Sequence, residues 1–211
     1  MKFDQLIELV ANEPVFSSSL LLAGKQNSYA VQLQLSRWVS AGKIIKLKRG
    51  LYALAEPWRK TIPHPFLTSN RLLPGSYVSL QAALAWHGAI PEYVPVVTSV
   101  GCGRPNVITT PLGSFQHNFI HEKFRFGYDK IEVAPSQFAF VAVPEKALLD
   151  LVFLTPGADT RAYIEELRLQ NHAAFHLDLL HNFAARSGKP KLQRAAAIIT
   201  TLFETDRNVS S

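Results

Sequence analysis

The chain has 211 residues, of which 47% are hydrophobic and 18% are charged, and its net charge at pH 7 is +6. This composition provides enough apolar side chains for one large or two small folded domains, and it excludes a disordered or low-complexity protein. The single cysteine, Cys102, excludes an internal disulfide and any zinc or iron–sulfur site that needs several cysteines.

The chain contains no apolar run long enough to span a membrane. The longest stretch without a charged residue, 72–91, is interrupted by proline, glycine, glutamine and histidine, whereas a spanning helix needs about 20 predominantly apolar residues. At the N-terminus, Asp4 and Glu8 are unlike the apolar segment of a secretory signal. We therefore expect a cytoplasmic protein without a membrane partner.

The positive charge is concentrated near the N-terminus. Residues 1–60 hold nine Lys or Arg and four Asp or Glu, a net charge of +5, whereas residues 61–211 have a net charge of +1. A basic segment followed by a nearly neutral one indicates that the first part meets a polyanion and that the second part has another role.

Three helical segments are expected near the N-terminus. Apolar residues recur at helical spacing over 3–10, a short apolar stretch covers 16–22, and a third helical pattern runs over 28–41. The third segment has an apolar face and a mostly polar face that carries Arg37. Leu33 lies on the polar face, where packing on the second helix is favoured over contact with a thymine methyl group.

A basic hairpin is expected directly after the third helix. Apolar residues alternate with period 2 from Ile45 to Leu54, and Arg49-Gly50 forms the turn. Four cations within seven residues, without an acidic residue, favour contact with phosphates over the protection of a sheet edge by lysine. Three helices closed by such a hairpin are typical of a winged helix-turn-helix, whose third helix enters the major groove. The candidate DNA-binding residues are Ser28, Tyr29, Gln32, Ser36, Arg37, Lys43, Lys46, Lys48 and Arg49.

The pattern divides the chain into two expected domains. Residues 1–60 form the winged helix-turn-helix domain, and the proline-containing residues 61–75 form a linker. Residues 76–211 form a second domain, in which Ser79 caps a short helix. Strand patterns come first in this domain and helical patterns later, an order that predicts a mixed α+β fold. The strands are expected at 94–100, 107–110, 114–121, 124–133 and 138–143, and the later helices at about 145–154, 160–170, 175–185 and 191–203.

Few residues of the second domain have the spacing of a catalytic or metal site. Phosphate-loop, serine-hydrolase and zinc-protease signatures are absent, so we expect no enzyme, no bound metal and no cofactor. His172 and His176 lie four residues apart, but without a third ligand at suitable spacing an ordinary amphipathic helix is favoured. His117 and His121 are expected on a packed face of a strand.

The segment that begins at Pro144 is expected to be a capped amphipathic helix. Pro144 suits the first helical position, and Glu145 suits the positive end of the helix dipole. Lys146 and Asp150 are separated by four residues, so they share a helix face as a surface pair that stabilises the helix by only a few tenths of a kcal/mol. The residue types and their spacing assign no further role to this helix.

Three segments, 35–52, 77–92 and 144–151, together resemble the AbiEi family, the antitoxins of type IV abortive-infection toxin–antitoxin systems. The resemblance covers about residues 30–170. It implies a DNA-binding antitoxin that represses its own promoter at an inverted-repeat operator, with a dimer on the DNA as one option. It also implies that the protein neutralises a nucleotidyltransferase-like toxin, directly or indirectly. The resemblance places the antitoxin motif at Glu145, Lys146 and Asp150.

Two other functions remain open at this stage. One is a free-standing winged-helix transcriptional regulator whose second domain senses a ligand or binds a protein. The other is a metal-dependent nuclease, since Asp129, Glu132, Glu145 and Lys146 provide carboxylates and a lysine, although not at the usual spacing. The basic cluster of Arg186, Lys189, Lys191 and Arg194 is a second phosphate contact or a solvated helix end, and the second interpretation is favoured.

Overall fold

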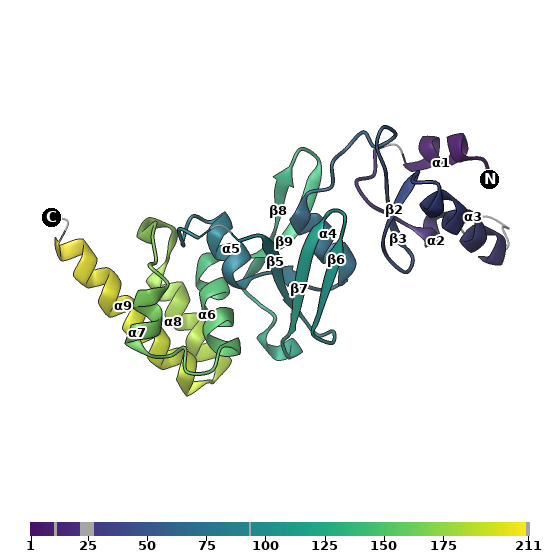
Figure 1. Cartoon of the computed structure of the whole chain (residues 1–211). Helices are drawn as coiled ribbons and strands as arrows, with labels where there is room; N and C mark the ends of the chain where they lie inside the picture. Colours follow the sequence, from purple (N-terminus) through teal and green to yellow (C-terminus); the bar gives the residue numbers. More distant parts are fainter. Residues whose placement is uncertain (11, 22–27, 93, 210–211) are drawn as a thin grey trace.

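A computed structural model of the chain describes residues 1–10, 12–21, 28–92 and 94–209, and its class is the mixed α+β expected from the sequence. Figure 1 shows a small N-terminal unit, a central β-sheet and a group of C-terminal helices, arranged in this order along the molecule. The N-terminal unit comprises the described part of residues 1–54.

The N-terminal unit consists of helices packed with a three-stranded antiparallel sheet. Leu6 of α1 and Leu35 and Trp38 of α3 are buried in its core, because helical spacing puts these side chains on one face of each helix. The sequence does not predict β1, which has only two residues, too few to show a period of two. β1 pairs with β3, which makes β3 the central strand. The elements are α1 (Phe3–Val10), β1 (Phe16–Ser17), α2 (Ser18–Leu21), α3 (Ser28–Ser40), β2 (Ile44–Lys48) and β3 (Leu51–Leu54).

The central sheet has six strands in the order β6-β7-β5-β4-β9-β8. Ser99 of β5 bonds to Ser69 of α4 (Pro65–Leu72), whereas the adjacent Thr98 bonds to Ala82 of α5 (Leu80–Trp86). Because successive residues of a strand point to opposite faces, α4 and α5 cover opposite faces of the sheet. The strands are β4 (Tyr77–Val78), β5 (Val96–Gly101), β6 (Asn106–Thr110), β7 (Gly113–Phe119), β8 (Tyr128–Ala134) and β9 (Gln137–Ala142).

Residues 61–75, expected as a linker, contain a helix that packs on the sheet. Pro65 lies at the start of α4, and the side chain of His64 accepts a hydrogen bond from the N–H of Phe66. Phe66 and Leu67 are buried. The linker interpretation is therefore wrong for α4, because Pro65, one of the prolines that suggested it, begins a helix.

A strand residue caps α5, not Ser79 as expected. Ser79 makes no capping bond, because its Oγ donates to Asp150 Oδ2 at 2.8 Å. Instead, Thr98 Oγ1 accepts from the N–H of Ala82 at 3.1 Å and donates to the carbonyl of Ser79 at 2.7 Å. Leu80 has φ +55°, a left-handed conformation that costs a non-glycine residue on the order of 1–3 kcal/mol. The two Thr98 bonds hold the chain in this sharp turn.

The C-terminal helices enclose the second half of the core. Leu148 of α6, Leu180 of α8 and Ile199 of α9 are fully buried. None of the helices in the described ranges is long and apolar enough to cross a membrane. The elements are η1 (Glu122–Phe124), α6 (Pro144–Leu154), α7 (Arg161–Glu166), η2 (His172–Ala174), α8 (Leu177–Ser187) and α9 (Pro190–Val209).

The N-terminal unit is not separate from the rest of the molecule. Val15, Leu47 and Leu51 are buried in the same hydrophobic cluster as the central sheet and the C-terminal helices. In addition, Lys48 Nζ donates to the carbonyl oxygen of Leu72 at the end of α4, at 2.6 Å. Residues 1–60 therefore share a core with the domain that follows them.

Candidate functional site

The outward face of α3 carries the predicted DNA-binding residues of this helix. Ser28, Tyr29, Gln32, Ser36 and Arg37 are all exposed, because the apolar stripe on the opposite face of α3 turns into the core. This arrangement presents hydroxyl, amide and guanidinium groups on one helical surface. These are the groups that proteins use to contact base edges and phosphates in the major groove.

Leu33 lies on the same face and is 42% exposed, so the expected packing of this side chain on the second helix is incomplete. Together with Gln34 and Arg37 it lines a shallow groove of about 210 Å³ beside Trp38. The groove gives the α3 face an apolar patch next to its polar side chains.

The four predicted hairpin cations differ in their surroundings. Lys46 and Arg49 are exposed, whereas Lys43 is half-buried with its Nζ 4.7 Å from the ring centre of Phe3. Lys48 is also half-buried, and its ammonium is bound to the carbonyl of Leu72. Lys48 therefore holds the hairpin against α4, a role that period-2 alternation cannot distinguish from phosphate contact.

Asp150 lies at the centre of a buried polar group that the sequence places on the surface. Its side chain is 1% exposed and forms an ion pair with Lys146, which is 3% exposed. Asp150 Oδ2 also accepts hydrogen bonds from the hydroxyls of Tyr77 at 2.9 Å and Ser79 at 2.8 Å. We call Tyr77, Ser79, Lys146 and Asp150 the Asp150 centre. The expectation of a weak surface pair is wrong, because α6 is covered on several sides.

Aromatic rings complete the surroundings of the Asp150 centre. Lys146 Nζ lies 4.8 Å from the ring centre of Phe126 and 5.9 Å from that of Tyr77, which stacks on Tyr128 at 4.3 Å. Burial raises the pKa of the Asp150 carboxyl, and the Lys146 ammonium opposes this rise. Burial and the neighbouring Asp150 carboxylate also raise the pKa of the Tyr77 hydroxyl, which therefore stays a hydrogen-bond donor.

Glu145 is buried beside the Asp150 centre but has a different contact. Its side chain is 1% exposed, and its Oε1 accepts a hydrogen bond from the N–H of His176 at 2.5 Å, directly before α8. A carboxylate at a helix N-terminus is stabilised by the helix dipole. Glu145 therefore joins the start of α6 to the start of α8.

Sequence reasoning missed several residues that shape this region. Tyr77 and Thr98 lie in strands, where alternation gives no sign that their polar atoms bond to helices. Gly127 has φ +70°, and a Cβ there would lie 2.6 Å from the ring of Phe183 and 3.1 Å from Lys146 Cβ. The position requires glycine because neither the backbone conformation nor the space admits a side chain.

A second buried polar group joins α4 to the β6–β7 hairpin. His117, 1% exposed, has its Nε2 3.2 Å from Ser69 Oγ and its Nδ1 3.1 Å from Asn106 Oδ1. Ser69 Oγ also bonds to Ser99 Oγ at 2.7 Å. The serine–histidine–asparagine arrangement resembles the Ser-His-Asp triad of hydrolases, but it lacks the carboxylate, and Ser69 is 0% exposed and lines no groove among those described. The arrangement is a structural link between α4 and the sheet.

The histidines and carboxylates do not assemble into a metal site in the described part of the chain, which holds no group of three or more potential ligands. His172 Nε2 lies 3.0 Å from the carbonyl of Leu169, and its ring stacks on Phe203 at 4.0 Å. Glu145 and Lys146 bond to other protein groups. The carboxylates and lysine considered for a nuclease are thus not gathered around one position.

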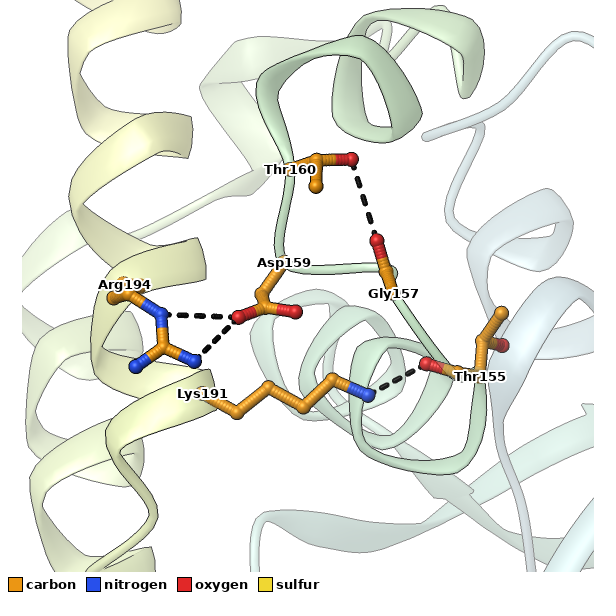
Figure 2. Close-up of polar contacts among 6 residues, drawn as sticks. All are labelled: Thr155, Gly157, Asp159, Thr160, Lys191 and Arg194. Atoms are coloured by element: carbon orange, nitrogen blue, oxygen red, sulfur yellow. Dashed lines mark hydrogen bonds and ion pairs between the residues drawn. The ribbon is translucent and has the colours of Figure 1, made fainter.

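The basic cluster near the C-terminus makes contacts within the protein (Figure 2). Lys191 Nζ donates to the carbonyl of Thr155 at 2.5 Å, and Arg194 pairs with Asp159 at 2.6 Å. The hydrogen bond from Arg194 holds the pKa of Asp159 below its ordinary value. These two bonds fasten the α6–α7 loop to α9. The remaining two cations, Arg186 and Lys189, lie over the rings of Phe126 and Phe124.

We expect a large loss of stability when one of the two charged side chains of the Asp150 centre is replaced. Asp150→Ala leaves the Lys146 ammonium buried and unpaired, and we expect the free energy of unfolding to fall by about 3–5 kcal/mol. Lys146→Met should have a similar effect. The double variant Lys146→Met/Asp150→Asn should cost less than the sum of the two single changes, because it leaves no unpaired charge. Urea unfolding followed by circular dichroism measures all three.

Arg161 and Glu165 provide the matched control, since they form another ion pair with the same i,i+4 spacing but are 62% and 49% exposed. Glu165→Ala should change the free energy of unfolding by less than about 1 kcal/mol. Equal losses for Asp150→Ala and Glu165→Ala would show that the Asp150 centre contributes no more than a surface pair.

From the burial of His117 we expect the free energy of unfolding to decrease in mild acid. Burial lowers the pKa of His117 below its ordinary value of 6.5, so the unfolded chain binds more protons than the folded chain between these two pKa values. The contribution of His117 to the free energy of unfolding is therefore complete above pH 6.5. It falls below pH 6.5 by at most about 1.4 kcal/mol per pH unit, until the pH reaches the folded pKa.

Measuring urea unfolding from pH 7.5 to 5 tests this dependence, and His117→Gln should make the profile flatter than that of the unmodified chain. The control is His121→Gln, which replaces a histidine that is exposed instead of buried. If the two variants gave the same profile, His117 would not be a source of the acid sensitivity.

One solved structure with a similar fold is the crystal structure of the RV2827C protein from Mycobacterium tuberculosis. The two chains are 15% identical and superpose with a TM-score of 0.56, and the similarity covers 93% of this chain and 75% of that one. No family model and no curated protein sequence matches the chain. At this identity the comparison shows a shared fold alone.

Proposed function

We propose that the chain is a double-stranded DNA-binding protein whose N-terminal unit acts as a winged helix-turn-helix. In this proposal α3 reads base edges in the major groove and the β2–β3 hairpin follows the phosphates. The observation that carries it is the exposed polar face of α3, with Gln32 and Arg37, next to a hairpin with exposed Lys46 and Arg49.

The electrostatics of this region support the same proposal. No acidic residue occurs between Ser28 and Leu54, whereas five Lys or Arg do. The positive charge of such a segment is not balanced within the segment itself, and it favours a polyanion through counterion release. A packing role alone would not need this uniform charge.

We further propose, from the resemblance to AbiEi antitoxins, that the protein represses its own promoter and neutralises a nucleotidyltransferase-like toxin. The neutralising surface lies outside the α3 face, in the nearly neutral part of the chain. Since Glu145, Lys146 and Asp150 are buried, their part in this activity is to position the surrounding surface and not to touch the toxin.

One observation favours an alternative function. In this alternative the protein is a free-standing regulator whose second domain senses a ligand. An open groove of about 460 Å³ lies between α5, α6 and the sheet, and it is lined by polar side chains such as Gln81 and Gln116. Its volume suits a small ligand. A toxin gene next to the gene of this protein would favour the antitoxin over the sensor.

The DNA-binding proposal predicts a defined dependence on salt. With Arg37, Lys43, Lys46 and Arg49 as phosphate contacts, the slope of log K against log salt should be about −3 to −4 per bound chain. Lys46→Ala should make the slope less negative by about 0.9 and should weaken binding to all sequences alike. Gln32→Ala should instead change the preferred sequence, by about 1–3 kcal/mol at one base pair. Fluorescence anisotropy with operator and random duplexes measures both effects.

Lys48 and Lys123 provide the controls for this experiment. Lys48→Ala should lower the free energy of unfolding but leave the salt slope unchanged, because its ammonium bonds to Leu72. Lys123 is an exposed lysine outside the N-terminal unit, and Lys123→Ala should change neither quantity. Affinity that is independent of salt would contradict the proposed interface.

Since the α3 face and the hairpin are proposed to bind DNA and a different surface to neutralise the toxin, substitutions should abolish one activity and leave the other intact. A full-length chain with Arg37→Ala, Lys46→Ala and Arg49→Ala should lose operator binding but still restore growth when it is produced together with the toxin from an unrelated promoter. All three side chains are exposed, so the melting temperature should stay the same. Loss of growth rescue in a folded triple variant would assign neutralisation to the α3 face or the hairpin.

A further inference from the structure

A groove of about 430 Å³ lies where the N-terminal unit meets the central sheet. Its walls are Glu13 and Pro14 of the N-terminal unit, the end of α4 with the turn that follows it, and the β8–β9 hairpin. Its volume lies within the range of sites for small organic ligands, about 300–1,000 Å³. None of its residues belongs to the α3 face or to the Asp150 centre.

Two cations from different elements line this groove. Arg71 of α4 and Lys130 of β8 are both exposed, and neither has an ion-pair partner among the residues that the structure describes. An arginine and a lysine that line one groove are suited to bind an anion, above all a phosphate. Glu13 of the N-terminal unit lines the same groove.

Two phenylalanines make the same groove partly apolar. Phe138 and Phe140 are 46% and 44% exposed, and as alternate residues of β9 they share one face of the strand. Phe140 lies directly opposite Lys130 in the β8–β9 register, and Lys130 Nζ is 4.9 Å from the ring centre of Phe138. Aromatic surface next to cations suits a ligand that combines a planar ring with an anionic group.

Hydrogen bonds of Asn70 hold the backbone around two residues that line the groove, Ser76 and Phe140. Ser76 is 3% exposed, and its Oγ has no hydrogen-bond partner in the described structure, although buried polar atoms are nearly always paired. Asn70 fixes the surrounding backbone, since its side chain donates to the carbonyl of Ser76 and accepts from the N–H of Phe140. The Ser76 hydroxyl itself is shielded from solvent, so the polar groups that the groove offers to a ligand are those of the exposed side chains.

We propose that this groove binds a nucleoside phosphate. The phosphate lies between Arg71 and Lys130, the base packs against Phe140, and the carboxylate of Glu13 accepts a hydrogen bond from a ribose hydroxyl or a base amino group. A sugar phosphate would leave the phenylalanine rings uncovered, and an apolar ligand would leave the two cations without a partner. A nucleoside phosphate satisfies both kinds of side chain.

Isothermal titration of the full-length chain tests this assignment with ADP, adenosine, ribose 5-phosphate and a glutamate-rich peptide. ADP should bind, and adenosine and ribose 5-phosphate should each bind at least tenfold more weakly. Equal affinity for ADP and ribose 5-phosphate would overturn the role of the base. Binding of the peptide without binding of ADP at millimolar concentration would overturn the proposal in favour of an acidic protein partner.

Substitutions locate the site. Arg71→Ala and Lys130→Ala should each weaken ADP binding at least tenfold, and Phe140→Leu should weaken ADP more than ribose 5-phosphate. Ser76→Ala should leave the ADP affinity unchanged, because this hydroxyl is shielded from solvent. Lys123 is the matched control, as its Nζ also lies over a phenylalanine ring, 5.1 Å from Phe124, but outside the groove.

Lys123→Ala should bind ADP like the unmodified chain. Unchanged ADP affinity in both Arg71→Ala and Lys130→Ala would overturn the proposal. The operator affinity of the same variants separates this result from the proposed function, since the α3 face is left intact. A chain that binds its operator but not ADP would contradict only the nucleotide site.

Discussion

The carboxylate of Asp150 connects parts of the chain that are about 70 residues apart, and much of the fold depends on this connection. It accepts from Tyr77 of β4 and from Ser79 in the turn before α5, while it pairs with Lys146 on its own helix. Because Ser79 is engaged with Asp150, it does not cap α5, and Thr98 of the neighbouring strand caps it instead. One buried charge thus determines how a strand, a turn and two helices meet.

The sequence predicts well those elements whose hydrophobic pattern is regular. α3 and the β2–β3 hairpin lie where the periods of 3.6 and 2 predict them, because a single apolar face determines both. α4 is misjudged, since proline marks the start of a helix as well as an irregular segment. β1 and β4 are too short to carry a period at all.

Burial of polar residues is what sequence spacing could not predict. The i,i+4 separation places Lys146 and Asp150 on one face of α6, but it does not say that this face is covered. Sequence spacing likewise predicts the same surroundings for Lys46 and Lys48. In the structure, however, only Lys48 of these two bonds to the end of α4. In both cases the missing information is the position of a distant element, which local pattern does not contain.

The core shared by the N-terminal unit and the central sheet limits how this architecture can be recombined. A segment that ends at residue 60 would carry Val15, Leu47 and Leu51 as bare apolar surface, and it would leave Lys48 without its acceptor on α4. Gene fusion or domain exchange at residue 60 would therefore produce a fragment that aggregates through its exposed apolar side chains. The unit that can be inherited or transplanted intact includes α4 and the sheet on which it rests.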